Sequence, residues 1–229
     1  MFTGNLLHLL HLSDPALPVG GFSHSAGLET YVQAGRVHDK QTAKEFVIQQ
    51  LSQNICYTDA AFVSLAYDAA CNNDVQTIVA LDATCTAVKL PKEMRLASNK
   101  LGTRLLKIFL RKEHFGVAKQ YKEFIKTQQA FGHYCIAFGI LASELKIEKQ
   151  DTLTGFFYNV AAGFVTNSVK LIPLGQQDGQ EILMSLFSLI DELVGKCLLP
   201  DKNMIGYCCA GFDIRCMQHE QLYSRLYMS

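Results

Sequence analysis

The sequence predicts an all-α protein, folded as a single-domain helical bundle of about nine to ten helices with irregular N- and C-terminal segments. Apolar residues recur at intervals of three and four along most of the chain, as they do on one face of an α-helix. No stretch is convincing as a strand. With 229 residues, of which 49% are hydrophobic, the chain can bury a sizeable core without disulfide bonds. We therefore expect one domain that spans residues 1–229.

The first half of the chain is expected to form helices that are separated by turn residues. They span residues 6–12, 25–34, 42–54, 59–71 and 74–88. Two prolines and a glycine pair between residues 13 and 21 cannot continue the first helix, and Gly35 ends the second. We therefore expect residues 1–24 to form a short helix followed by an irregular loop.

The second half begins with a helix that starts at Pro91, because the fixed φ of proline suits the first helical position. Its apolar stripe consists of Met94, Ala97, Leu101, Leu105 and Ile108. Further helices are expected at residues 121–129, 134–145 and 152–171. The last of these is apolar or small on most of its sides, which is typical of a central helix.

The last long helix has a recognisable beginning. Asp178 is expected to cap it, with Glu181 in the matching position of a capping box. Its buried face runs from Ile182 to Val194. After Pro200 the chain is expected to form a looser tail, of which residues 206–229 are a candidate partner-binding segment.

Composition argues against several functional classes. The formal net charge is zero, whereas a protein that binds nucleic acid is usually basic. The N-terminus lacks the basic start and the cleavage site of a signal peptide, and no run of about 18 apolar residues predicts a membrane-spanning helix. The eight cysteines are expected to be reduced thiols. We therefore expect a cytoplasmic protein that binds neither nucleic acid nor membrane.

Four motifs occur in order along the chain, and three of them lie in its polar, turn-rich segments. They are LSDPALPVGGFSHSAGLE at residues 12–29, PKEMRLAS at 91–98, LIPLGQQDGQ at 171–180 and HEQLYSRLYMS at 219–229. Together they resemble the signatures of the UreF family of urease accessory proteins, and the resemblance covers nearly the whole chain. The tail departs from the family pattern: Arg215 and Cys216 replace small residues, and Tyr227 stands where phenylalanine is common.

The resemblance implies an all-helical, dimer-forming, cytosolic protein that has no catalysis of its own. UreF-type proteins bridge two others: a UreD-type protein (UreH in some organisms), which contacts apo-urease, and a UreG-type GTPase, which carries nickel. The implied function is to help load nickel into urease. The structural signature of the family falls on Pro18, Gly20, His24 and Glu29. A nickel-binding metallochaperone and a regulator of the partner GTPase are the alternative functions.

Two segments are candidate sites for partners. The first contains Gln176, Asp178 and Gln180, which form either a rigid epitope for the GTPase or only a helix cap. The second is the tail, whose candidate residues are His219, Glu220, Tyr223, Arg225 and Leu226. If the tail is helical, it can lay an apolar stripe into a groove of the UreD-type partner. Arg225 is expected to anchor a partner, to act as an arginine finger for the GTPase, or to form a salt bridge inside the chain.

The sequence contains no strong candidate for catalysis. Ser23, His24 and Glu29 have the residue types of a catalytic triad, but neighbouring residues on a turn rarely reach its geometry. No phosphate-binding loop of the G-x-x-x-x-G-K-[ST] type is present. We therefore expect no enzyme activity and no cofactor.

A resident metal ion is not expected either. His8 and His11 share a helix face, but two imidazoles alone make a poor metal site. A second set of soft ligands in the tail fits no regular zinc spacing: Cys208, Cys209, Cys216 and His219.

Overall fold

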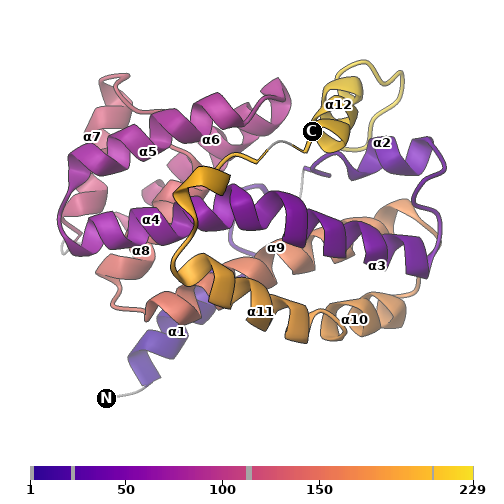
Figure 1. Cartoon of the computed structure of the whole chain (residues 1–229), viewed down its shortest axis with the longest axis horizontal. Coiled ribbons are helices and arrows are strands. Elements are labelled where there is room, and N and C mark those ends of the chain that lie inside the picture. The colour runs from indigo at the N-terminus through magenta and orange to yellow at the C-terminus, as the bar shows by residue number, and fades with distance from the viewer. Residues whose placement is uncertain (1–2, 22–23, 112–114, 208, 229) are drawn as a thin grey trace.

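The computed structural model describes residues 3–21, 24–111, 115–207 and 209–228 (Figure 1). Within these ranges the chain is mostly helical and has no strand, which confirms the predicted all-α class. The helices are α1 (Thr3–Leu12), α2 (Leu28–Gln33), α3 (Lys40–Gln49), α4 (Asp59–Cys71), α5 (Val75–Val88), α6 (Lys92–Phe109), α7 (Val117–Lys126), α8 (Tyr134–Glu144), α9 (Lys149–Leu171), α10 (Gln176–Met184), α11 (Phe187–Leu198) and α12 (Ala210–His219). A π-helix (Gln50–Asn54) and a 3-10 helix (Ile55–Tyr57) join α3 to α4, and a second 3-10 helix (Lys202–Met204) precedes α12.

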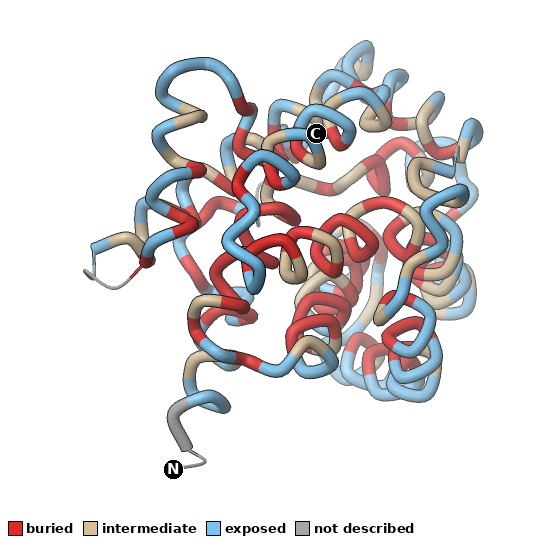
Figure 2. The backbone as a smooth tube through the Cα atoms, turned by 60° about the vertical axis from the view of Figure 1, so that its left-hand side comes forward, coloured by how far each residue is buried: buried red, intermediate tan, exposed pale blue. Residues whose placement is uncertain are grey.

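Helix α8 lies in the core of the bundle, and Figure 2 shows the buried segments gathered in the interior of the molecule. Every residue from Cys135 to Ser143 is buried. The helix packs closely on α4, because a Cβ at Gly139 would lie 2.4 Å from the carbonyl oxygen of Val63. Helix α9 packs beside both and also contacts α1, α2, α3, α10 and α11. Its many contacts agree with the central place predicted from its apolar sides.

The boundaries of several helices differ from the prediction. Helix α4 spans the expected residues, but the preceding helix begins early because Asp39 caps it by accepting from the amide of Thr42 at 2.8 Å. That helix changes to a π-helix at Gln50. Pro91 is the N-cap residue of α6, just before the first helical position in which we expected it.

The predicted last long helix is in fact two helices, α10 and α11. Gly175 is the N-cap residue of α10, and Asp178 lies one turn inside, where its Oδ2 accepts from the amide of Gly175 at 3.0 Å. Glu181 is not the capping-box residue and pairs with Lys40 of α3. The hydroxyl of Ser185 donates at 2.7 Å to a carbonyl at the end of α10, which satisfies a backbone group that the break leaves free.

This break, together with α12 in a tail expected to be irregular, accounts for the extra helices compared with the nine to ten expected. Measured over the residues that the structure describes, none of these helices is both long and apolar enough to traverse a lipid bilayer.

The segment after α1 is tied to the body of the bundle. Helix α1 packs on α9 at Gly155, where a Cβ would lie 2.4 Å from the hydroxyl oxygen of Ser13. The following loop is held by Arg104 of α6, whose Nη1 donates to the carbonyl of Val19 at 2.9 Å. Gly20 has a φ of +91°, and a Cβ there would lie 2.3 Å from the Arg104 guanidinium. The positive φ favours glycine at this signature position, and a larger residue would also displace the end of the Arg104 side chain.

Candidate interaction site

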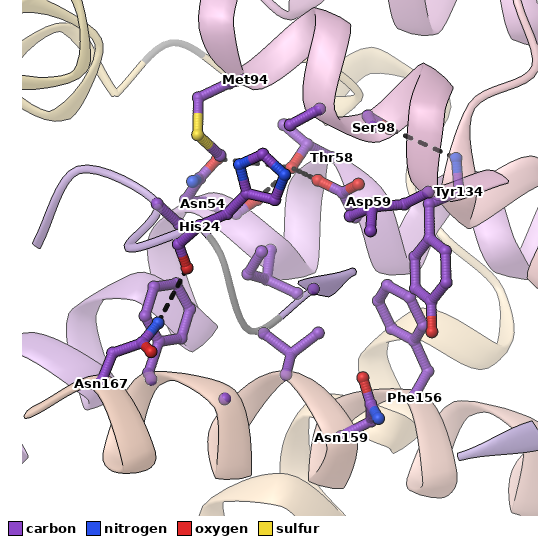
Figure 3. A pocket seen from close by; sticks show the side chains of 18 of the residues that line it. His24, Asn54, Thr58, Asp59, Met94, Ser98, Tyr134, Phe156, Asn159 and Asn167 are labelled. Atoms are coloured by element: carbon purple, nitrogen blue, oxygen red, sulfur yellow. Dashed lines mark hydrogen bonds between the residues drawn. The ribbon is translucent and has the colours of Figure 1, made fainter. Parts of the chain in front are cut away.

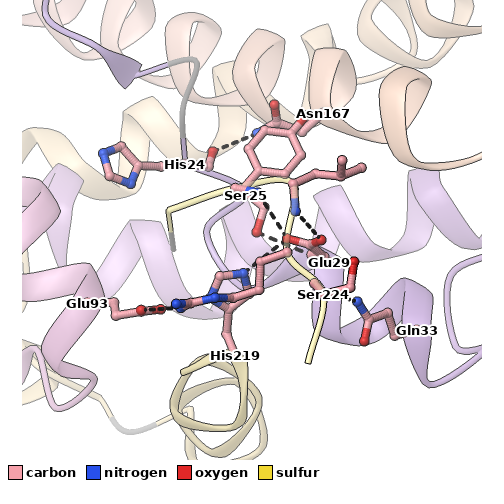
Figure 4. A network of polar contacts seen from close by, with 11 residues as sticks. His24, Ser25, Glu29, Gln33, Glu93, Asn167, His219 and Ser224 are labelled. Carbon is pink, nitrogen blue, oxygen red and sulfur yellow. Dashed lines mark hydrogen bonds and ion pairs between the residues drawn. The ribbon is translucent and has the colours of Figure 1, made fainter. Parts of the chain in front are cut away.

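The C-terminal segment folds back onto the body of the protein and is held there by polar contacts (Figure 4). Helix α12 packs against α2 and α6. After His219 the chain continues to residue 228 in turns. This segment meets Glu29 and Gln33 of α2 and Glu93 of α6.

Glu29 is the main acceptor for the segment, and it is only 3% exposed. Its carboxylate accepts from the amide of Leu226 at 2.8 Å and from the amide of Tyr227 at 3.3 Å. Nearby, the side-chain amide of Gln33 donates to the carbonyl of Ser224 at 3.1 Å. The backbone of the tail, more than its side chains, is thus attached to α2.

His219 lies between two carboxylates. Its Nε2 is 3.1 Å from Oε2 of Glu29, and its Nδ1 is 2.8 Å from Oε2 of Glu93. Both ring nitrogens therefore face carboxylate oxygens. Arg225 approaches the same cluster, with Nη1 2.8 Å from the other oxygen of Glu93. The imidazole ring and the guanidinium thus give both carboxylates polar partners, as buried polar groups require.

These contacts bear on the expectations for the tail. His219 is buried and faces inward, and its place among the partner-binding candidates stays a prediction. Arg225 forms the internal salt bridge that was one of its three expected roles. The tail is not one continuous helix through residue 227, because α12 ends at His219. The amides of residues 220–222 still bond to the preceding turn, whereas those of Leu226 and Tyr227 bond to Glu29.

The other tail candidates are exposed. Tyr223 and Leu226 point away from the body and have relative exposures of 107% and 78%. Glu220 is also exposed. Three more exposed apolar residues lie in the same segment, and together we name these five the tail patch: Ile214, Met217, Tyr223, Leu226 and Met228. Exposed apolar side chains on a backbone that is held in place are typical of a docking surface.

The predicted epitope before α10 lies in a different part of the fold from the tail, as Figure 1 shows. Gln176 and Gln180 are exposed, and Asp178 is half-buried. Asp178 is 3.0 Å from Nζ of Lys40. The Lys40 ammonium and then the amide of Gly175 lower the pKa of Asp178 below its usual value. The residue therefore both caps the helix and ties it to α3, and the two glutamines remain available on the surface.

One signature residue, His24, borders a cavity of about 290 Å³ between α6, α9 and the loop before α2 (Figure 3). The carbonyl of His24 accepts from the side-chain amide of Asn167 at 2.9 Å. Burial, and then the positive charges of Lys100 and Arg104, lower the pKa of His24, so its ring is neutral at physiological pH. Pro18 is exposed and does not line the cavity.

A largely buried ion pair also borders the cavity. Lys89 and Asp59 are 2.6 Å apart, with side chains 12% and 15% exposed. Burial opposes the ionisation of Asp59, but the charge and hydrogen bond of Lys89, together with His133 and Thr58, outweigh it, and the pKa of Asp59 lies below its usual value. Burial likewise opposes the charge on Lys89, whose pKa is nevertheless raised by Asp59. The pair joins α4 to the residue after α5.

Comparison with known proteins identifies the family. The UreF family profile matches residues 37–187. The chain belongs to the UreF family. It is 46% identical over 226 residues to "Urease accessory protein UreF" of Actinobacillus pleuropneumoniae, covering 99% of this chain and 100% of that protein.

Two other bacteria have proteins of the same description. The one from Haemophilus influenzae (strain ATCC 51907 / DSM 11121 / KW20 / Rd) is 47% identical over 221 residues, which cover 96% of this chain and 94% of that protein. The one from Bacillus sp. (strain TB-90) is 34% identical over 224 residues, covering 98% of this chain and 99% of that protein.

Among the described residues of this UreF-family chain, the cysteines and histidines with metal-binding potential do not gather into one metal site. Ser23 and Cys208 lie outside the described residues, and Glu29 is engaged by the tail. Cys209 donates to the carbonyl of Gln53 at 3.2 Å, whereas Cys216 is buried elsewhere on α12. The described ranges contain no group of three or more His, Cys, Asp or Glu side chains that could hold a metal ion.

His8 and His11 of the UreF-family chain also stay apart in their contacts. His11 packs on the ring of Phe109, with centroids 5.0 Å apart. His8 is half-buried on α1, and its Nδ1 is buried with no hydrogen-bond partner among the described residues.

Sequence analysis missed two acids that organise this UreF-family chain. Glu93 appeared there only as a letter of the PKEMRLAS motif, although it contacts both His219 and Arg225. Its position in the PKEMRLAS motif was the available signal. Asp82 is fully buried and accepts from the hydroxyl of Tyr121 at 2.6 Å and from the amide of His133 at 3.0 Å. A single acid in an apolar helix was the only signal for it.

Proposed function

We propose that this chain is a non-catalytic scaffold of urease maturation, which joins a UreD-type accessory protein to a UreG-type GTPase for nickel insertion into apo-urease. Membership of the UreF family supports a role in urease maturation. The finer role draws its main support from the tail patch, whose apolar side chains are exposed while its backbone is held by Glu29. We assign the tail patch to the UreD-type protein.

The internal salt bridge of Arg225 bears on how the tail acts. Because the guanidinium is bonded to Glu93, an arginine finger would have to leave that carboxylate and reach a GTPase active site. Anchoring is simpler, because Arg225 is still partly exposed and can bind a second carboxylate at its outer edge. We therefore propose that Arg225 orders the tail and borders the docking surface.

We assign the GTPase to the beginning of α10, where Gln176 and Gln180 are exposed on a helix that Lys40 ties to α3. A rigid epitope lowers the entropy that binding must overcome. The distance between this helix and the tail in Figure 1 allows two partners to bind at once. Regulation of GTP hydrolysis would then act through the position of the bound GTPase.

A second copy of the chain is the proposed partner of α1. Leu6, Leu7 and Leu10 have relative exposures of 57%, 63% and 58%. The helix projects from the bundle in both Figure 1 and Figure 2, so its apolar face is accessible to another molecule. A two-fold axis would place each face on its copy. We further propose that this assembly is cytoplasmic.

The assignment of the tail patch is tested with the double variant Tyr223→Ala and Leu226→Ala. Both changes keep the backbone bonds to Glu29, so folding and tail docking should be retained. We expect binding of the purified UreD-type protein, measured by calorimetry, to weaken by at least about tenfold, because exposed aromatic and apolar anchors dominate interface energy.

The matched control is Met184→Ala with Leu199→Ala, which removes two exposed apolar side chains far from the tail. It should bind normally. If the tail variant binds the UreD-type protein as tightly as the control, this interface is assigned to the wrong surface. Turnover of urea or GTP by the isolated chain that survives repurification and is lost on a point substitution would contradict the non-catalytic role.

A further inference from the structure

The charges of this neutral chain are distributed unevenly. Residues 92–126 contain ten of the 21 basic residues but only three of the 21 acidic residues. The rest of the chain therefore has 11 basic and 18 acidic residues. Helices α6 and α7 form most of the basic segment, and Figure 1 shows them at the opposite side of the bundle from α10 and α11, which carry several acids. A net charge of zero thus conceals a basic side and an acidic side.

The basic residues of α6 form one stripe. Lys100, Arg104 and Lys107 are separated by four and three residues, and Arg111 follows by four more, so all lie on the same side of the helix axis. All four are exposed. Arg104 uses one nitrogen to hold Val19, as described above. We name these four residues the α6 basic stripe.

The stripe is not neutralised within the described part of the chain. No carboxylate there forms an ion pair with Lys100, Lys107 or Arg111. Like charges three and four residues apart destabilise a helix by about 0.2–0.5 kcal/mol per pair. Elsewhere the chain alternates signs at the same spacing, as in Glu192–Lys196. The stripe therefore lowers the stability of α6, whereas a surface that only keeps the protein in solution can avoid this loss by alternating its charges.

An exposed aromatic side chain lies in a loop on another face of α6. Phe131 is 48% exposed. The loop packs on the buried side of the helix, because a Cβ at Gly102 would lie 2.1 Å from the carbonyl oxygen of Gly132. Gly102 is two residues away from both Lys100 and Arg104, so it points away from the stripe. Asp82 holds this loop by accepting from the amides of Phe131 and His133, and Phe131 is not part of the stripe.

We propose that the α6 basic stripe is a docking surface for a protein partner with an acidic face. This rests on the proposed function, because that partner is a member of the urease maturation assembly. The stripe is separate from the tail patch and from the beginning of α10, so it adds a third contact or extends one of them. Its contribution is electrostatic, so it increases the association rate and orients the partner.

The surrounding charge favours a protein over other occupants. A nucleic acid extends past a short stripe and would meet the acidic excess of the rest of the chain, which repels a polyanion. A second copy bound through a two-fold axis would place one stripe against the other, and the cations would repel. A folded protein with a local acidic patch matches the size and sign of the stripe.

The test uses Lys107→Glu with Arg111→Glu, which reverses two charges and leaves Arg104 in place. The control is Lys44→Glu with Lys202→Glu, which has the same charge change away from the stripe. Both are titrated with the cognate UreD-type protein, UreG-type GTPase and apo-urease, each purified, at about 50 and about 300 mM salt. Thermal melting confirms that both variants are folded.

We expect the stripe variant to bind one of these proteins at least about tenfold more weakly at low salt, with a reduced salt dependence, while the control changes less than about twofold. If all three proteins bind the stripe variant and the control equally, the proposal is overturned. Loss of binding to a duplex DNA oligomer alone, with unchanged protein binding, overturns it in favour of a nucleic acid.

The tail variant Tyr223→Ala with Leu226→Ala is measured in the same series to separate the two proposals. If it loses the UreD-type protein while the stripe variant binds everything normally, the scaffold function stands and the stripe proposal fails. If the unmodified chain binds none of the three proteins, the scaffold function itself fails, and the stripe proposal fails with it.

Discussion

Replacing Glu29 with glutamine should release the tail and leave the bundle folded. Glutamine keeps the shape of the side chain but loses the charge that faces His219, and its NH₂ group turns a donor toward other donors. The carboxylate accepts from His219 Nε2 at 3.1 Å and from the amides of Leu226 and Tyr227 at 2.8 and 3.3 Å. At least one of these three donors would lose its acceptor.

The magnitude follows from the burial of the group. A hydrogen bond to a charged group contributes about 1.5–3 kcal/mol, and an unpaired buried partner adds a further penalty. Glu93 remains as a partner of His219, so the full cost of about 3–5 kcal/mol for an isolated buried charge should not apply. We therefore expect tail docking to lose about 2–4 kcal/mol, which is about 30-fold to 1000-fold in its equilibrium constant.

Amide hydrogen exchange of residues 220–228 measures this change directly, because the amides of Leu226 and Tyr227 are protected only while the tail is docked. Their exchange should accelerate, while that of α8 should not. Glu220→Gln, at an exposed acid, is the control. Unchanged protection of the tail in Glu29→Gln would refute the reasoning, and unfolding of the whole protein would show that the tail belongs to the core.

Three further predictions concern other parts of the molecule. Removing the last dozen residues should preserve the helical signal in circular dichroism but abolish capture of the UreD-type protein. The single change Arg225→Ala should weaken that capture by about 1–3 kcal/mol in a pull-down titration. Normal capture by both variants would contradict the proposed site. Lys89→Met should destabilise the protein by about 3–5 kcal/mol in denaturant unfolding, because it leaves Asp59 buried and unpaired. The pKa of Asp59 is depressed in the folded state, so the stability that this ion pair contributes should be present above about pH 4 and lost as the pH falls further. Thermal melting curves recorded between about pH 2 and 7 would show this loss. The unmodified chain should sediment as a dimer, and Leu7→Glu with Leu10→Glu should convert it to a monomer. If the unmodified chain sediments only as a monomer, both alone and with its partners, the proposed dimer is contradicted.

The sequence was sufficient for the class of fold because helical periodicity is a local property. The 59–71 segment was located to the residue, since its apolar spacing and its ends are both encoded nearby. The break between α10 and α11 was missed because no proline or glycine marks it. Whether this segment forms one long helix or two depends on what each half packs against. Helix α10 contacts α3, whereas α11 contacts α4.

The candidate site was only partly predictable for the same reason. The sequence pointed to the tail with Tyr223 and Leu226, because a short motif carries a family signature, and the structure shows both side chains exposed. It could not indicate that His219 faces inward, since the ring is held by acids that are 190 and 126 residues away. Nor could it show the α6 basic stripe as unpaired, because ion pairing depends on which distant carboxylates come within reach.

What the sequence by itself determined is therefore the all-α class, most helices and the family, all of which depend on patterns within short windows. Only the tertiary structure decided that Glu29 and Glu93 hold the tail, that Asp82 supports the loop of Phe131, and that α1 projects from the bundle. Each of these arises where chain segments far apart in sequence meet. Burial and charge pairing at such contacts depend on all the segments that take part. No single stretch of sequence is therefore enough to predict them.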